Sequence, residues 1–246
     1  MPEGPSIVLL KEALQSFVDK KIVNADGSSK KIEYGRLPGA KIREIKTWGK
    51  HLLICLPDVT IRIHLLMFGS YSIDTPKQNR IAKLSLFFAR GRSVHFYACS
   101  VKLITEPLSR VYDWTADIMS KKWDSGKAVK KMNARSSELV CDILLDQDIF
   151  AGSGNIIKNE TLFRSKIHPK SVVGKIPPLR KKLLVRELIG YSKMFLKWRR
   201  ANTLKRHWLA YSKKICPRDH HPLAKEYMGK SRRRTFFCET CQKLYG

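Results

Sequence analysis

The residues that follow the initiator methionine could do covalent chemistry. Removal of Met1 would leave Pro2 at the start of the chain, with a secondary amine that can form an iminium ion with an aldehyde carbon. An α-amino group has an ordinary pKa of about 7.7–8.0, so a useful fraction is unprotonated near neutral pH. Glu3 comes next and supplies a carboxyl group that can move protons. The alternative is structural, because proline is common after the initiator and Glu3 would also suit a helix N-terminus.

A second group of candidate residues lies near the C-terminus, and its residue types are those that bind metal ions. Cys216 precedes the pair Cys238–Cys241 by a spacing typical of zinc sites. The upstream pair lacks a second cysteine, so we expect His220 to complete a Cys3His site with structural zinc. His221 is the alternative, and Asp219 the less favoured third, because structural zinc prefers sulfur and nitrogen ligands. Only metal would organise so small and polar a segment.

The charge of the chain indicates its partner. The sequence carries 48 Lys and Arg against 21 Asp and Glu, a net charge of +27. A polyanion would offset this charge, so nucleic acid is the leading partner. An anionic membrane is the rival, but the basic residues are spread along the chain rather than gathered on one amphipathic helix or tail. With no long apolar run and no signal-peptide pattern, we expect an intracellular protein, in the cytoplasm and at the nucleoid if the source is bacterial. We also expect it to be a monomer.

The elements that must position these residues change along the chain. An amphipathic helix is predicted over residues 6–17, with Pro5 in its first turn. Short strands and turns between residues 20 and 108 predict a sandwich or barrel, with strands over residues 41–45, 51–56, 60–66, 81–88 and 93–97. Residues 109–135 are typical of a polar linker. Helical patterns follow over residues 139–144, 156–163, 179–189 and 191–198.

Three further segments could contact a polyanion. Lys50, in a turn before an apolar strand, could bind phosphate or donate a proton, although a plain surface lysine is the alternative. The glycine-rich turn 151–155 permits close approach of its backbone amides, and its last residue, Asn155, would suit a phosphate. Arginines in the segment 230–235, Arg233 and Arg234 among them, would be presented to phosphate near the tip of a β-hairpin.

Three bulky apolar residues in a row could act in another way. Leu66, Met67 and Phe68 precede Gly69, and such a row cannot all face one side of a strand. Part of the row is therefore expected to be exposed, where apolar side chains can wedge into a base stack. The alternative is a fully buried strand end.

These pieces, in this order, resemble the formamidopyrimidine-DNA glycosylase/endonuclease VIII family of base-excision repair enzymes. The resemblance spans nearly the whole chain and rests on four segments, namely residues 2–5, residues 49–53, residues 152–156 with Glu160, and residues 233–242. It implies an α+β multidomain fold: an N-terminal catalytic β-sandwich domain with an N-terminal helix (1–120), a helix-two-turn-helix DNA-binding domain (121–212) and a zinc-finger β-hairpin (213–246). DNA would bind in the cleft between them.

The resemblance also assigns catalytic roles. Pro2 would attack C1′ of the damaged nucleotide and form a Schiff base, with Glu3 as general acid or proton shuttle. Lys50, Asn155 and Arg233 would hold the flanking phosphates. Lys50 would also donate a proton in β-elimination, and the finger arginine would assist δ-elimination. Arg233 is preferred over Arg234 because it stands five residues before Cys238.

The endonuclease VIII branch of the family fits best. Gly4 is typical of that branch, the void-filling residues cluster as Leu66, Met67 and Phe68, and an Asp-Pro-Arg-Arg-Phe segment of the other branch is missing. The implied protein is a bifunctional glycosylase and AP lyase that excises oxidised bases, chiefly pyrimidines, from damaged double-stranded DNA, with single-stranded or bubble DNA as further substrates. The alternatives are an enzyme directed at 8-oxoguanine and formamidopyrimidine, and a non-catalytic DNA-binding protein on the same scaffold.

Overall fold

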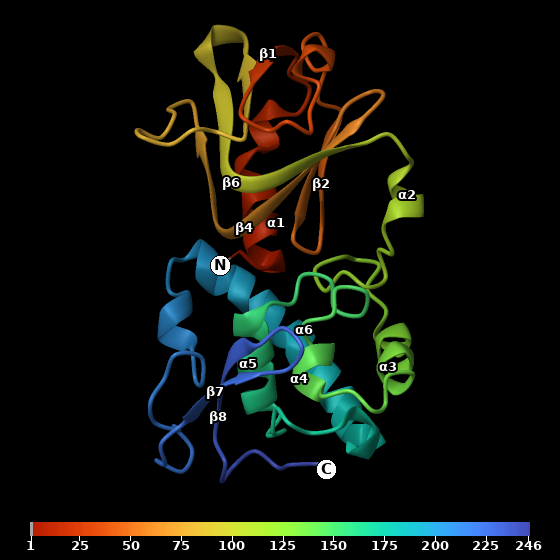
Figure 1. Cartoon of the computed structure of the whole chain (residues 1–246), viewed down its shortest axis with the longest axis vertical. Helices are drawn as coiled ribbons and strands as arrows, with labels where there is room; N and C mark the ends of the chain where they lie inside the picture. The colour runs from red at the N-terminus through yellow and green to blue at the C-terminus, as the bar shows by residue number, and fades with distance from the viewer. Residues whose placement is uncertain (1) are drawn as a thin grey trace. The chain divides into compact units, whose positions relative to one another are not determined.

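The structure is a computed structural model that describes residues 2–246. The chain forms two compact units, which meet in the sequence between Tyr112 and Asp113. The resemblance implies a boundary after residue 120 and a separate C-terminal hairpin, whereas the contacts within the chain place the hairpin in the second unit. The predicted α+β class is confirmed: a sheet with an N-terminal helix is followed by a helical region and a small hairpin (Figure 1). A cysteine cluster lies beside this hairpin.

The first unit is built on one sheet of six strands, hydrogen-bonded in the order β1-β5-β6-β4-β3-β2 with antiparallel neighbours throughout. The strands are β1 (Ile22–Asp26), β2 (Glu44–Trp48), β3 (His51–Cys55), β4 (Thr60–Ile73), β5 (Leu84–Phe88) and β6 (Ser93–Ile104). The long strands β4 and β6 join the two halves of the sheet. Both halves contribute to one buried core, with Ile54 from one half and Leu86 from the other.

A bulge interrupts the pairing of β4 with β6. The register changes between Leu65 and Ser70, so the intervening residues leave the ladder. Gly69 permits this local geometry: a Cβ placed there would lie 2.8 Å from the amide nitrogen of Leu66 and 2.9 Å from the carbonyl oxygen of Ala98. Only a residue without a side chain fits so close to two backbone segments.

Helix α1 (Gly4–Ala13) covers one end of this sheet, and a 3-10 turn (Gln15–Phe17) continues it. The predicted helix is therefore confirmed, with Pro5 in its first turn. Ile7 and Leu10 are buried, and the helix contacts β2 and β3 (Figure 1). Burial of this face fixes the start of the helix, and with it the residues that immediately precede Gly4.

The second unit is mainly helical. After the short helix α2 (Leu108–Val111) in the first unit, its elements are α3 (Ser125–Asn133), α4 (Val140–Ile143), α5 (Asn155–Arg164), α6 (Pro178–Arg200) and the hairpin strands β7 (Ala224–Met228) and β8 (Arg233–Phe237). Helix α5 packs against both α6 and β8 (Figure 1). Among residues 2–246, no helix is both long enough and apolar enough to cross a bilayer.

Two sequence predictions need correction here. Residues 109–135 are not simply a linker, because α3 forms within them and buries Ala128 and Met132. The apolar face of α3 is short, so the helical spacing of its apolar residues could not be recognised among the lysines. The N-cap of α3 is Asp124, whose side chain accepts a hydrogen bond from the Lys127 amide at 2.9 Å. The two helical patterns around Gly190 are one helix, since α6 runs through that glycine without a break.

The hairpin docks on the helices through its tip. Lys230 donates from its amide to Asp142 at 2.9 Å and from Nζ to Glu138 at 2.8 Å. Gly229 takes a positive φ of 71°, which favours glycine, and a Cβ there would also displace the Asp142 carboxylate. Phe237 and Met228 belong to the same buried cluster as the helices. The hairpin is thus held at its tip and through its buried side chains, and its arginines start from a fixed backbone.

Three cysteines, Cys55, Cys99 and Cys141, lie outside the C-terminal group, and each is a buried or partly buried thiol. Cys99 and Cys141 are buried, and burial raises the pKa of each to about 11. Cys55 is partly buried, and burial likewise raises its pKa. All three therefore stay protonated near neutral pH, which is the unreactive form of a thiol.

Candidate functional site

Pro2 and Glu3 lie immediately before α1. Glu3 is the N-cap residue, with extended backbone angles, and its carbonyl oxygen accepts the first helical hydrogen bond, from the Ser6 amide at 2.8 Å. Its carboxyl group makes no capping hydrogen bond and is fully buried. Pro2 is partly exposed. Met1, whose removal would free the proline amine, lies outside the described residues. A buried carboxyl group beside a partly exposed proline suits proton transfer better than helix capping.

Lys50 sits in the two-residue turn that joins β2 and β3. Trp48 pairs with His51 across this turn, and Gly49 takes a positive φ of 54° that a larger residue would resist. The tight turn places the Lys50 side chain at the end of a rigid hairpin. The predicted lysine is therefore presented by a fixed element rather than by a flexible loop.

A cluster of aromatic rings lies next to this turn. The ring of His51 lies 5.1 Å from His64 and 5.8 Å from Tyr112, and its Nδ1 is 3.2 Å from the Tyr112 hydroxyl. Burial lowers the pKa of His51 to about 3, with help from the nearby charges of His64, Arg62 and Lys50. Burial also lowers the pKa of His64. Both imidazoles are therefore neutral near pH 7, so these two rings add no positive charge near Lys50.

The apolar row in β4 is exposed, as the sequence suggested. Leu66 is 49%, Met67 50% and Phe68 80% exposed, and all three lie in the bulge where β4 leaves its partner. Exposure of three consecutive bulky side chains is unfavourable in water unless a partner covers them. The bulge is thus a candidate contact surface of the first unit.

Asn155 begins α5, directly after the buried turn 151–154. Its Nδ2 donates to the carbonyl oxygen of Arg234 at 2.8 Å, and its Oδ1 is buried with no hydrogen-bond partner. Asn159, one turn on, accepts from the Phe236 amide at 2.6 Å. The glycine-rich turn and the hairpin strand are therefore tied together through the first turn of α5, a link that the sequence did not reveal.

Glu160 is an anchor that sequence reasoning recognised only as part of a motif. Its buried carboxylate accepts from the backbone amides of residues 209–211 at 2.9–3.0 Å. It also lies 3.8 Å from Arg164. Such a carboxylate, held by several amides, fixes the segment that leads into the cysteine cluster.

The two candidate arginines differ in their surroundings. The Arg234 guanidinium donates to the Tyr227 hydroxyl at 3.1 Å and lies 5.7 Å from the centre of that ring. Within residues 2–246, the Arg233 guanidinium has no hydrogen-bond or ion-pair partner. Arg233 is partly exposed at the start of β8. The guanidinium whose N–H groups are available to a ligand is therefore that of Arg233, which the spacing to Cys238 also favours.

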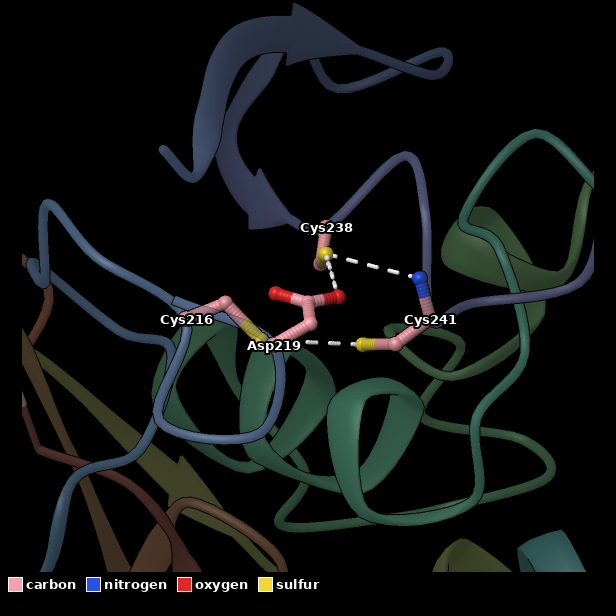
Figure 2. A group of neighbouring side chains, drawn as sticks. All are labelled: Cys216, Asp219, Cys238 and Cys241. Atoms are coloured by element: carbon pink, nitrogen blue, oxygen red, sulfur yellow. Dashed lines mark hydrogen bonds between the residues drawn. The ribbon is translucent and has the colours of Figure 1, made fainter. Parts of the chain in front are cut away.

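The cysteine cluster brings together Cys216, Asp219, Cys238 and Cys241. Figure 2 shows their side chains pointing toward one another, with Cys238 at the end of β8. Their ligand atoms all lie within 4.8 Å of each other. Asp219 stands where the sequence analysis expected His220, whose side chain is exposed and outside this group. The backbone at His220 takes a positive φ of 61° in the turn just after Asp219.

The distances fit a tetrahedral metal ion. The sulfur atoms of Cys216 and Cys241 are 3.7 Å apart, and a zinc ion bound at about 2.3 Å to each sulfur would separate them by about 3.8 Å. Asp219 Oδ2 lies 3.1 Å from the sulfur of Cys238. Three sulfur donors and one carboxylate oxygen suit zinc, and the four side chains could hold it without a fifth ligand.

A cation outside the group faces one of these sulfurs. Arg218 donates from a terminal nitrogen to the sulfur of Cys241 at 2.9 Å, and its guanidinium lies 3.8 Å from the centre of the Phe163 ring. The guanidinium is therefore held in place by an aromatic face. Such outer contacts orient metal ligands and offset their charge.

Family models match both units of the chain. One described as the formamidopyrimidine-DNA glycosylase N-terminal domain matches residues 1–99. Another, described as the formamidopyrimidine-DNA glycosylase H2TH domain, matches residues 105–192. The two together cover most of the sheet, the buried turn 151–154 and most of α6.

Relatives in animals carry the name endonuclease 8-like. Mouse endonuclease 8-like 2 is 26% identical over 98% of this chain and 96% of its own length. Human endonuclease 8-like 2 is 34% identical over 65% of this chain and 47% of its own length. Endonuclease 8-like 3 of Xenopus laevis is 29% identical, but the chain spans only 38% of that relative. These relatives are eukaryotic, so a bacterial source has no support.

Solved structures share the fold over nearly the whole chain. A viral DNA glycosylase has a TM-score of 0.85 at 22% identity, covering 98% of this chain and 100% of that one. The formamidopyrimidine-DNA glycosylase of Lactococcus lactis, solved non-covalently bound to DNA containing an AP site, has a TM-score of 0.87 at 22% identity over 98% and 99%. Since two models of one family match the two units in order, and endonuclease 8-like relatives align along the chain, this chain belongs to the formamidopyrimidine-DNA glycosylase/endonuclease VIII family of DNA-repair glycosylases.

Proposed function

We propose that this protein is a bifunctional DNA glycosylase and AP lyase that excises oxidised bases, chiefly pyrimidines, and then cleaves the strand. The observation that carries the proposal is the pairing of Pro2 with a fully buried Glu3 at the start of α1. A non-catalytic DNA-binding protein would need neither a secondary amine nor a buried carboxyl group there. Family membership and the endonuclease 8-like relatives support the same reading.

The chemistry would proceed through a covalent intermediate on Pro2. The lone pair of its nitrogen bonds to C1′ of the nucleotide as the bond from C1′ to the base breaks, and the base leaves with the bonding electrons and takes up a proton. The nitrogen then loses its own proton, the C1′–O4′ bond opens with its electron pair going to O4′, which receives a proton, and nitrogen and C1′ share the double bond of an iminium ion. Glu3 moves protons in these steps. Loss of a proton from C2′ afterwards expels the 3′ phosphate, which is β-elimination, and the Lys50 ammonium assists as a proton donor.

Binding to damaged duplex DNA would rest on phosphate contacts from each unit. Lys50 serves the first unit, and Arg233 and the amides around Asn155 serve the second. Arg233 is supported by its unpartnered guanidinium, whereas Arg234 already bonds Tyr227. The net charge of +27 adds a sequence-independent attraction that weakens as salt rises.

The exposed apolar row would act on the base stack. When a damaged nucleotide leaves the helix, Leu66, Met67 and Phe68 could fill the gap that it leaves. Their exposure in the bulge of β4 supports this role. The row offers no amide to pair with the base left opposite, so we expect weak preference for that base.

The cysteine cluster would hold a structural zinc ion through Cys216, Cys238, Cys241 and, as the fourth ligand, Asp219. The proposal of His220 gives way to Asp219 because only the latter lies within reach of the three sulfurs. Bound zinc would join the segment that precedes β7 to the segment that follows β8. It takes no part in the reaction at Pro2.

A cleavage panel of defined lesions tests this function. Duplexes that contain an oxidised pyrimidine, 8-oxoguanine, formamidopyrimidine or an abasic site are incubated with the protein, and the ends of the products are identified. We expect base release and strand cleavage to be fastest on oxidised pyrimidines. Faster release of 8-oxoguanine would favour the purine-directed alternative, and binding without any cleavage would favour the non-catalytic one.

A further inference from the structure

A pocket of about 640 Å³ lies in the second unit, between the start of α3 and the middle of α6. Its apolar wall is formed by Trp123, Val129, Val185 and Ile189. Trp123 is held in position by stacking on Phe150, with ring centres 5.9 Å apart. The volume falls in the range that protein pockets use for compact organic groups. None of the residues assigned above to catalysis, phosphate or zinc lines it.

The rim of the pocket is strongly basic. Lys182, Arg186 and Lys193 are exposed and project from α6, at spacings that place them along one side of the helix. In the part of the chain that the structure describes, none of the three has an ion-pair partner, and no acidic side chain lines the pocket. The rim therefore complements an anionic ligand, and the wall an apolar one.

Gly190 keeps the pocket open. It lies inside the long helix α6, where glycine lowers helix stability, and it does not take a positive φ. A Cβ built there would meet no atom within 4 Å, so packing does not require glycine either. Because Gly190 has no side chain, free space remains at this point in the wall of the pocket.

We propose that this pocket docks an acidic peptide segment of a partner protein, with one bulky apolar side chain inserted against Trp123 and carboxylates on the three cations. The two features together favour a peptide over DNA. A phosphate backbone would satisfy Lys182 and Arg186 but would leave the apolar wall empty, since it carries no apolar group to insert. A short acidic peptide satisfies both, in the manner of an anchor residue with a polar rim.

Peptide display on the intact protein tests this proposal. Random short peptides are selected on the wild-type chain and counter-selected on Gly190→Leu, whose side chain would fill the pocket. We expect the surviving peptides to carry a large apolar residue flanked by Asp or Glu. Absence of such a motif, or equal capture by both proteins, would overturn the proposal.

Fluorescence anisotropy with a selected peptide then separates fit from charge. Gly190→Leu and the double variant Lys182→Glu/Arg186→Glu should each raise the Kd at least about tenfold. Gly190→Ala, which adds only one carbon and favours the helix, should bind within about threefold of wild type, as should Lys197→Glu on the same helix but outside the pocket. Equal weakening by Lys197→Glu would reduce the effect to bulk charge and contradict the pocket.

A competition arm addresses DNA directly. An undamaged duplex is added to the peptide complex at low salt, and the AP lyase activity of each variant is measured in parallel. The proposal expects the peptide to stay bound and strand cleavage to be unchanged in Gly190→Leu. Displacement of the peptide by duplex, with weaker DNA binding in the double variant, would assign the surface to DNA instead. If wild type showed no lyase activity, the proposed function of Pro2 would be contradicted, while the peptide-binding result for the pocket would still stand.

Discussion

Asn155 Nδ2 donates a hydrogen bond to the carbonyl oxygen of Arg234, at 2.8 Å, across 79 positions of the sequence. This bond joins the start of α5 to the hairpin strand that carries both candidate arginines. Asn155 therefore has a structural duty beside any contact with phosphate, and a loss of function in its variants has two explanations. Arg233, whose guanidinium is unpartnered within residues 2–246, has no such duty.

This difference predicts opposite behaviour for two variants. Asn155→Ala removes a partly buried hydrogen bond and should lower the free energy of unfolding by about 0.5–1.5 kcal/mol. Arg233→Ala should change stability by less than about 0.5 kcal/mol, yet weaken DNA binding and reduce the slope of log K against log salt by about 1. Urea unfolding and salt-dependent binding measure the two effects. A destabilised Arg233→Ala with unchanged DNA affinity would contradict the assignment.

The exposed row in β4 predicts a separation of stability from activity. Phe68→Ala should leave the free energy of unfolding within about 0.5 kcal/mol of wild type, because the side chain is 80% exposed. Excision of a damaged base should nevertheless slow, since the gap in the stack is left unfilled. Single-turnover rates measure this loss.

Ile81→Ala is the matched control for Phe68→Ala. Ile81 is 82% exposed in the same unit, so its truncation removes a similar amount of exposed apolar surface. We expect its excision rate to match wild type. If both variants slowed equally, exposed apolar area in general, rather than the bulge, would explain the result.

His51 should make the first unit sensitive to acid. Burial lowers the pKa of His51 to about 3 in the folded state, whereas the unfolded chain takes up a proton near its ordinary pKa of 6.5. The unfolded state binds more protons between these values, so stability is complete above about pH 6.5 and falls as pH decreases toward 3. Each unit of pKa difference corresponds to about 1.4 kcal/mol.

Two measurements check this expectation for His51. Its ring resonances should not titrate between about pH 8 and pH 5 in an NMR titration. His51→Gln should lose less stability than wild type over the same range in urea unfolding. A titration midpoint near the ordinary value would show that the imidazole is solvated and would remove the basis for a neutral ring beside Lys50.

The fourth metal ligand can be identified by metal content. Asp219→Ala should lower the affinity for zinc, because it removes one of four donors, while His220→Ala and His221→Ala should keep the full zinc content. Arg218→Met should weaken binding by about 10–100-fold through loss of its contact with the Cys241 sulfur. Metal analysis and competition with a chelator give these values. Loss of zinc in His220→Ala with retention in Asp219→Ala would reverse the assignment.

The sequence was most informative where a residue type had a single use. The glycines around residues 152–154 and the three clustered cysteines could each be recognised without coordinates, because few structures need those residues at that spacing. The pattern also predicted that part of the row 66–68 is exposed, since three bulky residues in a row cannot all turn inward, and the bulge exposes all three.

What the sequence could not supply were properties of three-dimensional proximity. Preference for nitrogen over oxygen ligands pointed to His220, but the turn after Cys216 aims Asp219 at the sulfurs instead. Helix α3 was hidden because its apolar face is short and its surface rich in lysine. The unbroken course of α6 through Gly190 depends on packing, which overrides the low helix propensity of glycine.

The covalent role of Pro2 is tested most directly by borohydride trapping on a duplex that contains an abasic site, followed by protease digestion and mass analysis of the adduct. The account predicts a trapped complex in which the sugar remnant is attached to the peptide that begins with Pro2, from protein that has lost Met1. Attachment to an internal lysine such as Lys50, or cleavage of the strand with no trapped complex, would contradict it.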